Sequence, residues 1–319
     1  MAIVGKEVKD DEVMVDRISV LPDQLLDRIV DMLPMSDVFR ISVLSKRWKC
    51  CWTRFGNLDF GEEFFKKYII SRGHNLVSII DSVMSLHDGP VYRGHLYVRG
   101  YDDEEFESLN FTKWIQFLSK NGIKDLSVHT AHMGYVGIPS DIFNCCSLQR
   151  LHLFICQLEP SLGFSGFRKL ISLELLYCKL PDSLLESMIS NSPLLEELVL
   201  VDPKPREHFA VDAPNLKSLK LFNFEPTPLC LVEYSKLTTA SICSALMIPA
   251  NKFTASALSK FSSFLPRIEN LSTHWTTLAS LGAGGVPFRL PTPFKYLEHL
   301  ELDEFDVVSL DPIFCLLHT

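Results

Sequence analysis

The sequence lacks several features that would point to a metal site, a membrane span or an exported protein. Nine cysteines are present, an odd number that includes the adjacent pairs Cys50-Cys51 and Cys145-Cys146. None stands at the C-x-x-C spacing of a zinc site, and the set favours a reducing compartment. The first residues carry no apolar core behind a basic start, and stretches without charge, such as Leu237 to Asn251, are too short or too polar to span a bilayer. We therefore expect a protein of the cytoplasm, the nucleus or both, with no membrane partner.

An excess of positive charge is also missing. Lys and Arg number 31 against 39 Asp and Glu, which gives a formal net charge of -8 and a pI near 5.7. A surface that follows nucleic-acid phosphates would need clustered Lys and Arg, so no nucleic-acid partner is expected. With 319 residues, of which 47% are hydrophobic and 22% charged, the chain is long enough for one large globular domain and a small one.

The segment from residue 21 to residue 52 is rich in large apolar side chains. Pro22 suits a first helical turn, where its missing N–H costs nothing. Pro34 ends this helix, and Ser36 is expected to cap a second one. The apolar residues of the first helix fall at spacings of three and four: Leu25, Leu26, Ile29 and Leu33. Two further short helices carry Val38, Phe39, Ile41, Leu44, Trp48 and Trp52. Three such helices enclose very little core, so we expect another protein to complete it.

Residue types occur in this segment in a specific order: Asp16-Arg17-Ile18-Ser19, Leu21-Pro22-Asp23, Leu25-Leu26, Ile29, Leu33-Pro34, and Val43-Leu44-Ser45-Lys46-Arg47-Trp48 followed by Trp52. In order and spacing they resemble the F-box of plant F-box/leucine-rich-repeat proteins. The resemblance implies docking on a Skp-type adaptor, which links the chain to a cullin-RING ubiquitin ligase. Carried over by position, it implies these adaptor-binding residues: Leu21, Pro22, Leu25, Leu26, Ile29, Leu33, Val38, Leu44 and Trp48. The alternative is that they are ordinary core residues of a helical cap.

The body of the chain repeats the pattern L-x-x-L-x-L-x-x-C-x-L. Residues 148–158 and 170–180 match it in full. Weaker copies begin at Ile123, Leu195, Leu216, Leu237, Ile268 and Leu297. The copies follow one another at intervals of 21 to 31 residues, which suits one strand and a return segment each. No unit can bury its leucines alone, so we expect neighbouring units to stack. Cys156 and Cys178 fall at the turn after a strand, where we expect a structural role.

These patterns predict an α/β protein with a small N-terminal three-helix F-box followed by a curved leucine-rich-repeat solenoid with one parallel sheet. The expected organisation is a flexible N-terminus at 1–15, the F-box at 16–60, a helical connector with a first strand at 61–122, the repeats at 123–293, and an FBD-like region at 294–319. The last part is expected because FKYLEHLELDEF, residues 294–305, resembles the opening of the FBD module with which this family usually ends. The resemblance implies that the module is truncated here.

Side chains that alternate with the inward leucines are expected on the concave face of the solenoid. One row there runs through Phe154, Leu176, Val201, Phe222 and Cys243, then His274 and Asp303. Apolar and aromatic residues on a face that meets solvent are typical of a protein-binding surface. The candidate target-binding residues are therefore Phe154, Leu176, Val201 and Phe222. Two alternatives stay open: other segments cover the row, or the predicted register is off by one residue.

Motifs that would indicate catalysis are weak. His129-x-x-His132 has no further ligands at a suitable spacing for a metal. Gly282-Ala-Gly284-Gly285 is not followed by a helix that could hold a phosphate, and no G-x-S-x-G motif occurs. We expect neither an enzyme nor a cofactor.

The predicted function is that of a substrate-recognition adaptor of a Skp-cullin-F-box (SCF) ubiquitin ligase. The F-box would bind the Skp-type adaptor, and the repeats would bind a target protein that the sequence does not identify. The alternative is a non-catalytic repeat scaffold, or a decoy, that binds partners without promoting ubiquitination.

Overall fold

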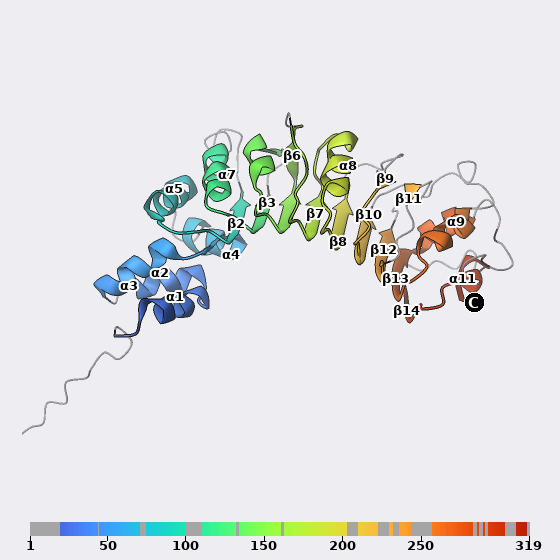
Figure 1. Ribbon diagram of the computed structural model, residues 1–319, viewed down its shortest axis with the longest axis horizontal. Coiled ribbons are helices and arrows are strands. Elements are labelled where there is room, and N and C mark those ends of the chain that lie inside the picture. The colour runs from blue at the N-terminus through green and yellow to red at the C-terminus, as the bar shows by residue number, and fades with distance from the viewer. Residues whose placement is uncertain are drawn as a thin grey trace, which may run out of the picture.

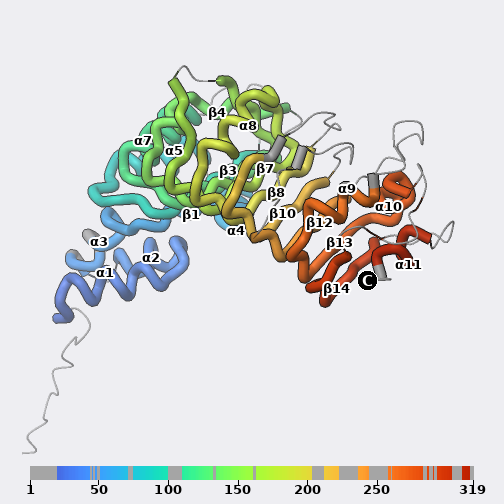
Figure 2. The backbone as a smooth tube through the Cα atoms, turned by 45° about the vertical axis from the view of Figure 1, so that its right-hand side comes forward, coloured from blue at the N-terminus to red at the C-terminus, as the bar shows by residue number. Residues whose placement is uncertain are grey.

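The computed structural model describes residues 20–43, 45–70, 75–99, 110–131, 134–160, 163–202, 210–222, 230–231, 236–243, 257–282, 286, 290, 293–303 and 311–317. A unit of short helices lies at one end, and a long array of strands and helices extends from it as an arc (Figures 1 and 2). The main sheet lies along the inner side of the arc (Figure 1). Helices on its outer side include α5 (Leu76–Leu86), α7 (Phe111–Lys120) and α8 (Asp182–Ser190). Within the described ranges, no helix is long and apolar enough to cross a membrane.

Proline and serine residues set the starts of the helices in the N-terminal unit. These are α1 (Asp23–Asp31), α2 (Met35–Ile41) and α3 (Lys46–Cys51), followed by the 3-10 turn η1 (Trp52–Arg54). Pro22 and Pro34 stand at the N-cap positions of α1 and α2, so Ser36 lies inside α2 and does not cap it as predicted. Ser45 caps α3, because its side chain accepts a hydrogen bond of 3.3 Å from the backbone N–H of Trp48.

Ten parallel strands form the main sheet. In order across the sheet they are β1 (Asn57–Phe60), β2 (Arg93–Val98), β3 (Asp125–Thr130), β5 (Arg150–Phe154), β7 (Ser172–Leu176), β8 (Glu197–Val201), β10 (Ser218–Phe222), β12 (Thr239–Cys243), β13 (Asn270–His274) and β14 (His299–Asp303). Equivalent residues of neighbouring repeats pair directly, so Leu151 lies beside Leu126 on one side and Leu173 on the other. The predicted fold class, with N-terminal helices followed by one parallel sheet, is confirmed.

Further short elements lie between these strands, and the last of them follows β14. They are α4 (Glu62–Phe64), the π-helix η2 (Phe65–Ile70), β4 (Val136–Ile138), η3 (Ser140–Asn144), β6 (Cys156–Leu158), β9 (Ala210–Val211), β11 (Cys230–Leu231), α9 (Ala257–Phe264), α10 (Trp275–Gly282) and α11 (Asp311–Leu317). Strand β4 pairs with β6, and β9 pairs with β11. These two small parallel pairs lie outside the main sheet and belong to the return segments.

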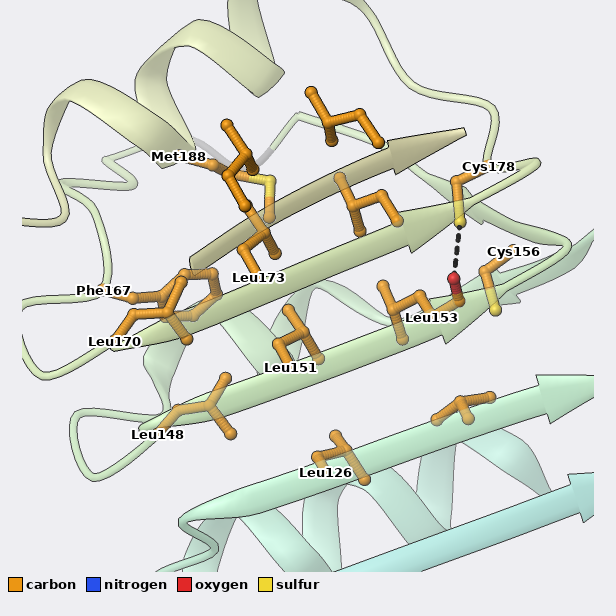
Figure 3. Close-up of a cluster of buried hydrophobic side chains, with 14 of the residues drawn as sticks. Leu126, Leu148, Leu151, Leu153, Cys156, Phe167, Leu170, Leu173, Cys178 and Met188 are labelled. Carbon is orange, nitrogen blue, oxygen red and sulfur yellow. Dashed lines mark hydrogen bonds between the residues drawn. The ribbon is translucent and has the colours of Figure 1, made fainter. Parts of the chain in front are cut away.

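The leucines of the repeat pattern fill the core between the sheet and the outer helices. Figure 3 shows Leu151, Leu153 and Leu173 on one side of adjacent strands, together with Met188 of α8, and all four are buried. Burial of one such side chain stabilises the fold by about 1.5–3 kcal/mol. The thiol of Cys178 donates a hydrogen bond of 3.3 Å to the carbonyl of Leu153 in the preceding repeat, so this turn cysteine joins two repeats (Figure 3).

The sheet begins earlier than the repeat pattern predicted. Strand β2 falls in the range 61–122, where a first strand was expected, but β1 precedes it and lies inside the range expected for the F-box. Leu58 and Phe60 are buried and Asp59 between them is exposed, which is the alternation of a strand. Four residues contain too few alternations to separate a short strand from the end of a helical unit by sequence alone.

Candidate protein-interaction surfaces

Helix α1 presents two apolar stripes. Leu26 and Val30 point inward and are buried in the core of the chain. Leu25, Ile29 and Met32 follow one another at spacings of four and three, and their exposed fractions are 44%, 36% and 85%. A helix that only closed its own core would need one such stripe, with polar residues on its other faces. We call Leu25, Ile29 and Met32 the outer stripe of α1.

Two ion pairs tie α1 to the segments that follow it. Arg47 Nη2 lies 2.7 Å from Asp23 Oδ1, and Arg54 Nη2 lies 3.3 Å from Asp27 Oδ1. The hydrogen bond and charge of Arg47 lower the pKa of Asp23. The burial of Leu26 and Val30 sets the rotation of α1 about its axis and leaves the outer stripe in solvent, and these exposed ion pairs are compatible with it.

The residues predicted to face an adaptor divide into three groups. Leu26, Val38 and Trp48 are buried in the chain's own core, which corrects the expectation that their side chains lie on a free surface. Leu21 and Leu33 are half-buried against that core. The exposed members are Pro22, Leu25 and Ile29, whereas Leu44 lies outside the described residues. The physical reason for the correction is that even this small unit must bury one side of each helix.

The predicted set omitted exposed apolar residues of the same unit, among them Met32 and Val43. Met32 extends the spacing of Leu25 and Ile29 by one turn, so the period of the helix could have identified it. Val43, in the turn after α2, is 83% exposed and carries no comparable pattern in the sequence. Both are large apolar side chains left in solvent, which is typical of interaction surfaces when such residues gather.

The concave face of the sheet carries the predicted row in the predicted register. Phe154 of β5 lies beside Leu176 of β7, Leu176 beside Val201 of β8, and Val201 beside Phe222 of β10. All four side chains are half-buried, and each is the last residue of its strand and follows a buried leucine that points into the core. The register alternative is therefore excluded for these strands. Whether the row binds a target stays a prediction.

Aromatic rings extend this row toward the N-terminal end of the sheet. The ring centroids of Tyr97 and His129 are 5.3 Å apart, those of His129 and Phe154 are 4.3 Å apart, and those of Phe154 and Tyr177 are 5.8 Å apart. Tyr97 is covered by Phe65 of η2, with centroids 5.5 Å apart. The sequence prediction missed this extension. The extension starts at Tyr97 on β2, before the first repeat copy. On the other side of Phe154 the aromatic rings include Tyr177, which follows the end of β7.

A second row of side chains lies on the same face, two residues earlier in each strand. It holds paired polar groups. His95 Nδ1 lies 3.1 Å from Asp59 Oδ1, and His152 Nδ1 lies 3.3 Å from Glu174 Oε2. The hydrogen bond from His95 lowers the pKa of Asp59 although burial opposes the shift. Burial, and then the neighbouring His152 and His95, lower the pKa of His129. At neutral pH the carboxylates of this part of the face therefore carry negative charge. His129 beside them is largely uncharged.

The described residues bring no three or more His, Cys, Asp or Glu side chains together in a way that could hold a metal ion. His129 takes part in the aromatic row, while His132 and the glycines at 284 and 285 lie outside the described residues.

Family models match two parts of the chain. The model for the F-box domain matches residues 18–60, which cover the three-helix unit and β1. The model described as "FBD-associated F-box protein At5g56370, LRR repeats" matches residues 111–278, from α7 into the first half of α10.

Similar curated proteins come from Arabidopsis thaliana. F-box/FBD/LRR-repeat protein At1g13570 is 31% identical over 316 residues, which cover 95% of this chain and 72% of that protein. The chain belongs to the F-box/FBD/LRR-repeat family. FBD-associated F-box protein At1g60410 is 28% identical over 72% of this chain, and FBD-associated F-box protein At4g10400 is 30% identical over 65% of it. The chain spans 57% and 55% of the lengths of these two relatives.

The two family models assign each of the two surfaces to a domain. The outer stripe of α1 belongs to the F-box, and the concave row from Phe154 to Phe222 belongs to the LRR repeats. Tyr97 and Asp59 lie on strands that the LRR model does not cover, yet β1 and β2 pair in register with the repeat strands. The concave face of this F-box/LRR protein is therefore continuous from the F-box boundary onward.

Proposed function

We propose that this chain is a substrate-recognition adaptor of an SCF ubiquitin ligase. F-box domains generally bind Skp1-type adaptors in SCF complexes, and F-box/LRR proteins are typically non-enzymatic. In this proposal the F-box anchors the chain to the ligase and the repeats hold a target protein. A lysine of the target is then kept near the charged ubiquitin carrier at high effective concentration. The chain contributes geometry, and its partners supply the transfer chemistry.

The observation that supports the adaptor contact best is the outer stripe of α1. Leu25, Ile29 and Met32 are apolar and exposed although α1 already buries Leu26 and Val30 on its inner side. Moving a large apolar side chain out of water is worth about 1.5–3 kcal/mol before association costs are subtracted. Pro22, at the N-cap of α1, is also exposed and belongs to the proposed contact.

The test is capture of a Skp-type adaptor by a variant with Leu25→Asp and Ile29→Asp. We expect capture to be lost, because two charges would be placed in an apolar interface, while the fold persists because both side chains are exposed. The matched control is Leu86→Asp with Leu194→Asp, two exposed leucines outside the F-box, which should leave capture unchanged. Undiminished capture by the first variant, with its circular dichroism intact, would refute the proposed contact.

The target-binding part of the proposal rests on the concave row. Phe154, Leu176, Val201 and Phe222 are adjacent, half-buried and apolar on the face that the outer helices do not cover. Aromatic anchors of this kind contribute a large share of binding energy at protein interfaces. We also retain the proposed division of the chain, including residues 294–319 as the start of an FBD-like region.

We expect Phe154→Ser with Phe222→Ser to weaken capture of target proteins without affecting the adaptor contact. Proximity labelling in cells with the proteasome blocked measures both at once, because the adaptor serves as the internal control. Unchanged target labelling would discard the row as the binding surface. Capture of a partner that never becomes ubiquitinated would instead favour the scaffold or decoy.

A further inference from the structure

The charged residues of the concave face are mainly acidic. Three rows of side chains alternate with the inward leucines along the ten strands. Their acidic members are Asp59, Asp125, Glu174, Glu197, Glu301 and Asp303. Their basic members are Arg93, Arg150 and Lys220. The excess of carboxylates lies along the whole inner side of the arc and is not confined to one strand.

One of the basic residues is already neutralised within the face. Arg93 Nε lies 3.3 Å from Asp125 Oδ2, so this pair adds no net charge. Without this pair, the three rows contain two basic residues, Arg150 and Lys220, and five acidic ones. Glu174 and Glu197 lie on the adjacent strands β7 and β8 in the middle of the array, and Glu301 and Asp303 lie on β14 at its far end.

The same face offers aromatic ring surfaces beside the central carboxylates. Phe154 is half-buried, and Tyr177 is 41% exposed with its ring 5.8 Å from that of Phe154. Glu174 lies two residues before Leu176, the strand partner of Phe154. A guanidinium or ammonium group gains both from a nearby carboxylate and from the face of an aromatic ring. An acidic side chain would gain from neither.

We propose that the concave face holds an extended basic segment of the target protein, with arginine or lysine side chains set between Glu174, Glu197 and the rings of Phe154 and Tyr177. This inference rests on the proposed function, because it names the class of target that the repeats take. The acidic face attracts a positive segment and repels an acidic one, which supplies selectivity as well as a faster encounter. The apolar row supplies the contact area next to it.

The experiment uses the full chain and two fluorescein-labelled peptides of equal length, one of Arg-Gly-Ser repeats and one of Glu-Gly-Ser repeats. Fluorescence anisotropy measures the affinity of each. We expect binding of the arginine peptide, weaker at high salt because exposed charges are screened, and no measurable binding of the glutamate peptide. Equal affinities for the two peptides would overturn the proposal.

Variants locate the binding. Glu174→Gln with Glu197→Gln should weaken binding of the arginine peptide roughly three- to tenfold. The matched control is Glu186→Gln on α8 with Asp88→Asn after α5, which removes the same charge away from the concave face. If both variants weaken binding equally, the peptide follows the overall negative charge of the chain and the proposal is wrong. Loss of peptide binding would leave adaptor capture intact, whereas failure of the proposed function would appear as lost adaptor capture or absent ubiquitination.

Discussion

At the scale of single residues, Asp81 is the clearest polar contact between two outer helices. Its Oδ1 accepts a hydrogen bond of 2.7 Å from Nε1 of Trp114, and its Oδ2 accepts one of 2.9 Å from the side chain of Asn110. Trp114 is fully buried, so its N–H has to find a partner inside the protein. Asp81 thus fixes α5 of one repeat to α7 of the next.

We expect Asp81→Ala to lower the free energy of unfolding by about 1–3 kcal/mol, because the indole N–H is left unpaired. Lys113→Ala is the control: its Nζ is 3.6 Å from Asp81 and it is largely exposed, so the change should stay within about 0.5 kcal/mol. Urea denaturation followed by circular dichroism measures both. A loss no larger than that of the control would show that the contact adds nothing to stability.

The same contact has a predictable pH dependence. Burial raises the pKa of Asp81, but the hydrogen bonds from Trp114 and Asn110 and the charge of Lys113 outweigh it and lower the pKa overall. A carboxyl whose pKa is lowered by folding stabilises the protein above its unfolded pKa of about 3.9, and this contribution is lost as the pH falls through the lower folded value. The difference between wild type and Asp81→Ala should therefore be constant near neutral pH and shrink only in acid.

At the scale of elements, the repeat pattern predicted the strands of the repeats, but it did not place every ring on their concave face. Leucines at fixed spacing identify strands because each repeat must bury them against its neighbours. Tyr177 could not be placed in the same way. Its backbone, like that of Ile155 at the equivalent position, takes a positive φ, 53° and 54° respectively. The simple alternation of side chains ends at such a residue, so its neighbour across the row cannot be found by counting.

Helix α1 shows a second limit of the sequence. Spacings of three and four predicted an amphipathic helix, but Leu25 and Leu26 are neighbours in the sequence and begin two different stripes. Periodicity cannot say which stripe faces inward, because both fit a helix equally well. The ion pairs of Asp23 and Asp27 with Arg47 and Arg54 join segments that the local sequence does not connect. The surface open to a partner is therefore visible only in three dimensions.

At the scale of the whole molecule, stability is distributed along a one-dimensional array. Each strand of the main sheet pairs only with its immediate neighbours in the sheet, so stability is approximately a sum of repeat and interface contributions. Leu153 and Leu302 occupy the same position in their repeats. Leu153 is fully buried between Val128 and Leu175, whereas Leu302 is half-buried and has Thr273 as its partner in β13.

The same substitution at these two positions should therefore have different costs. We expect Leu153→Ala to lower the free energy of unfolding by about 2–5 kcal/mol, because it opens a cavity between two repeats that cannot close independently. Leu302→Ala should cost roughly 1 kcal/mol, since part of the side chain already meets solvent. Urea denaturation gives both values. Equal losses would mean that β14 is packed as tightly as the central strands.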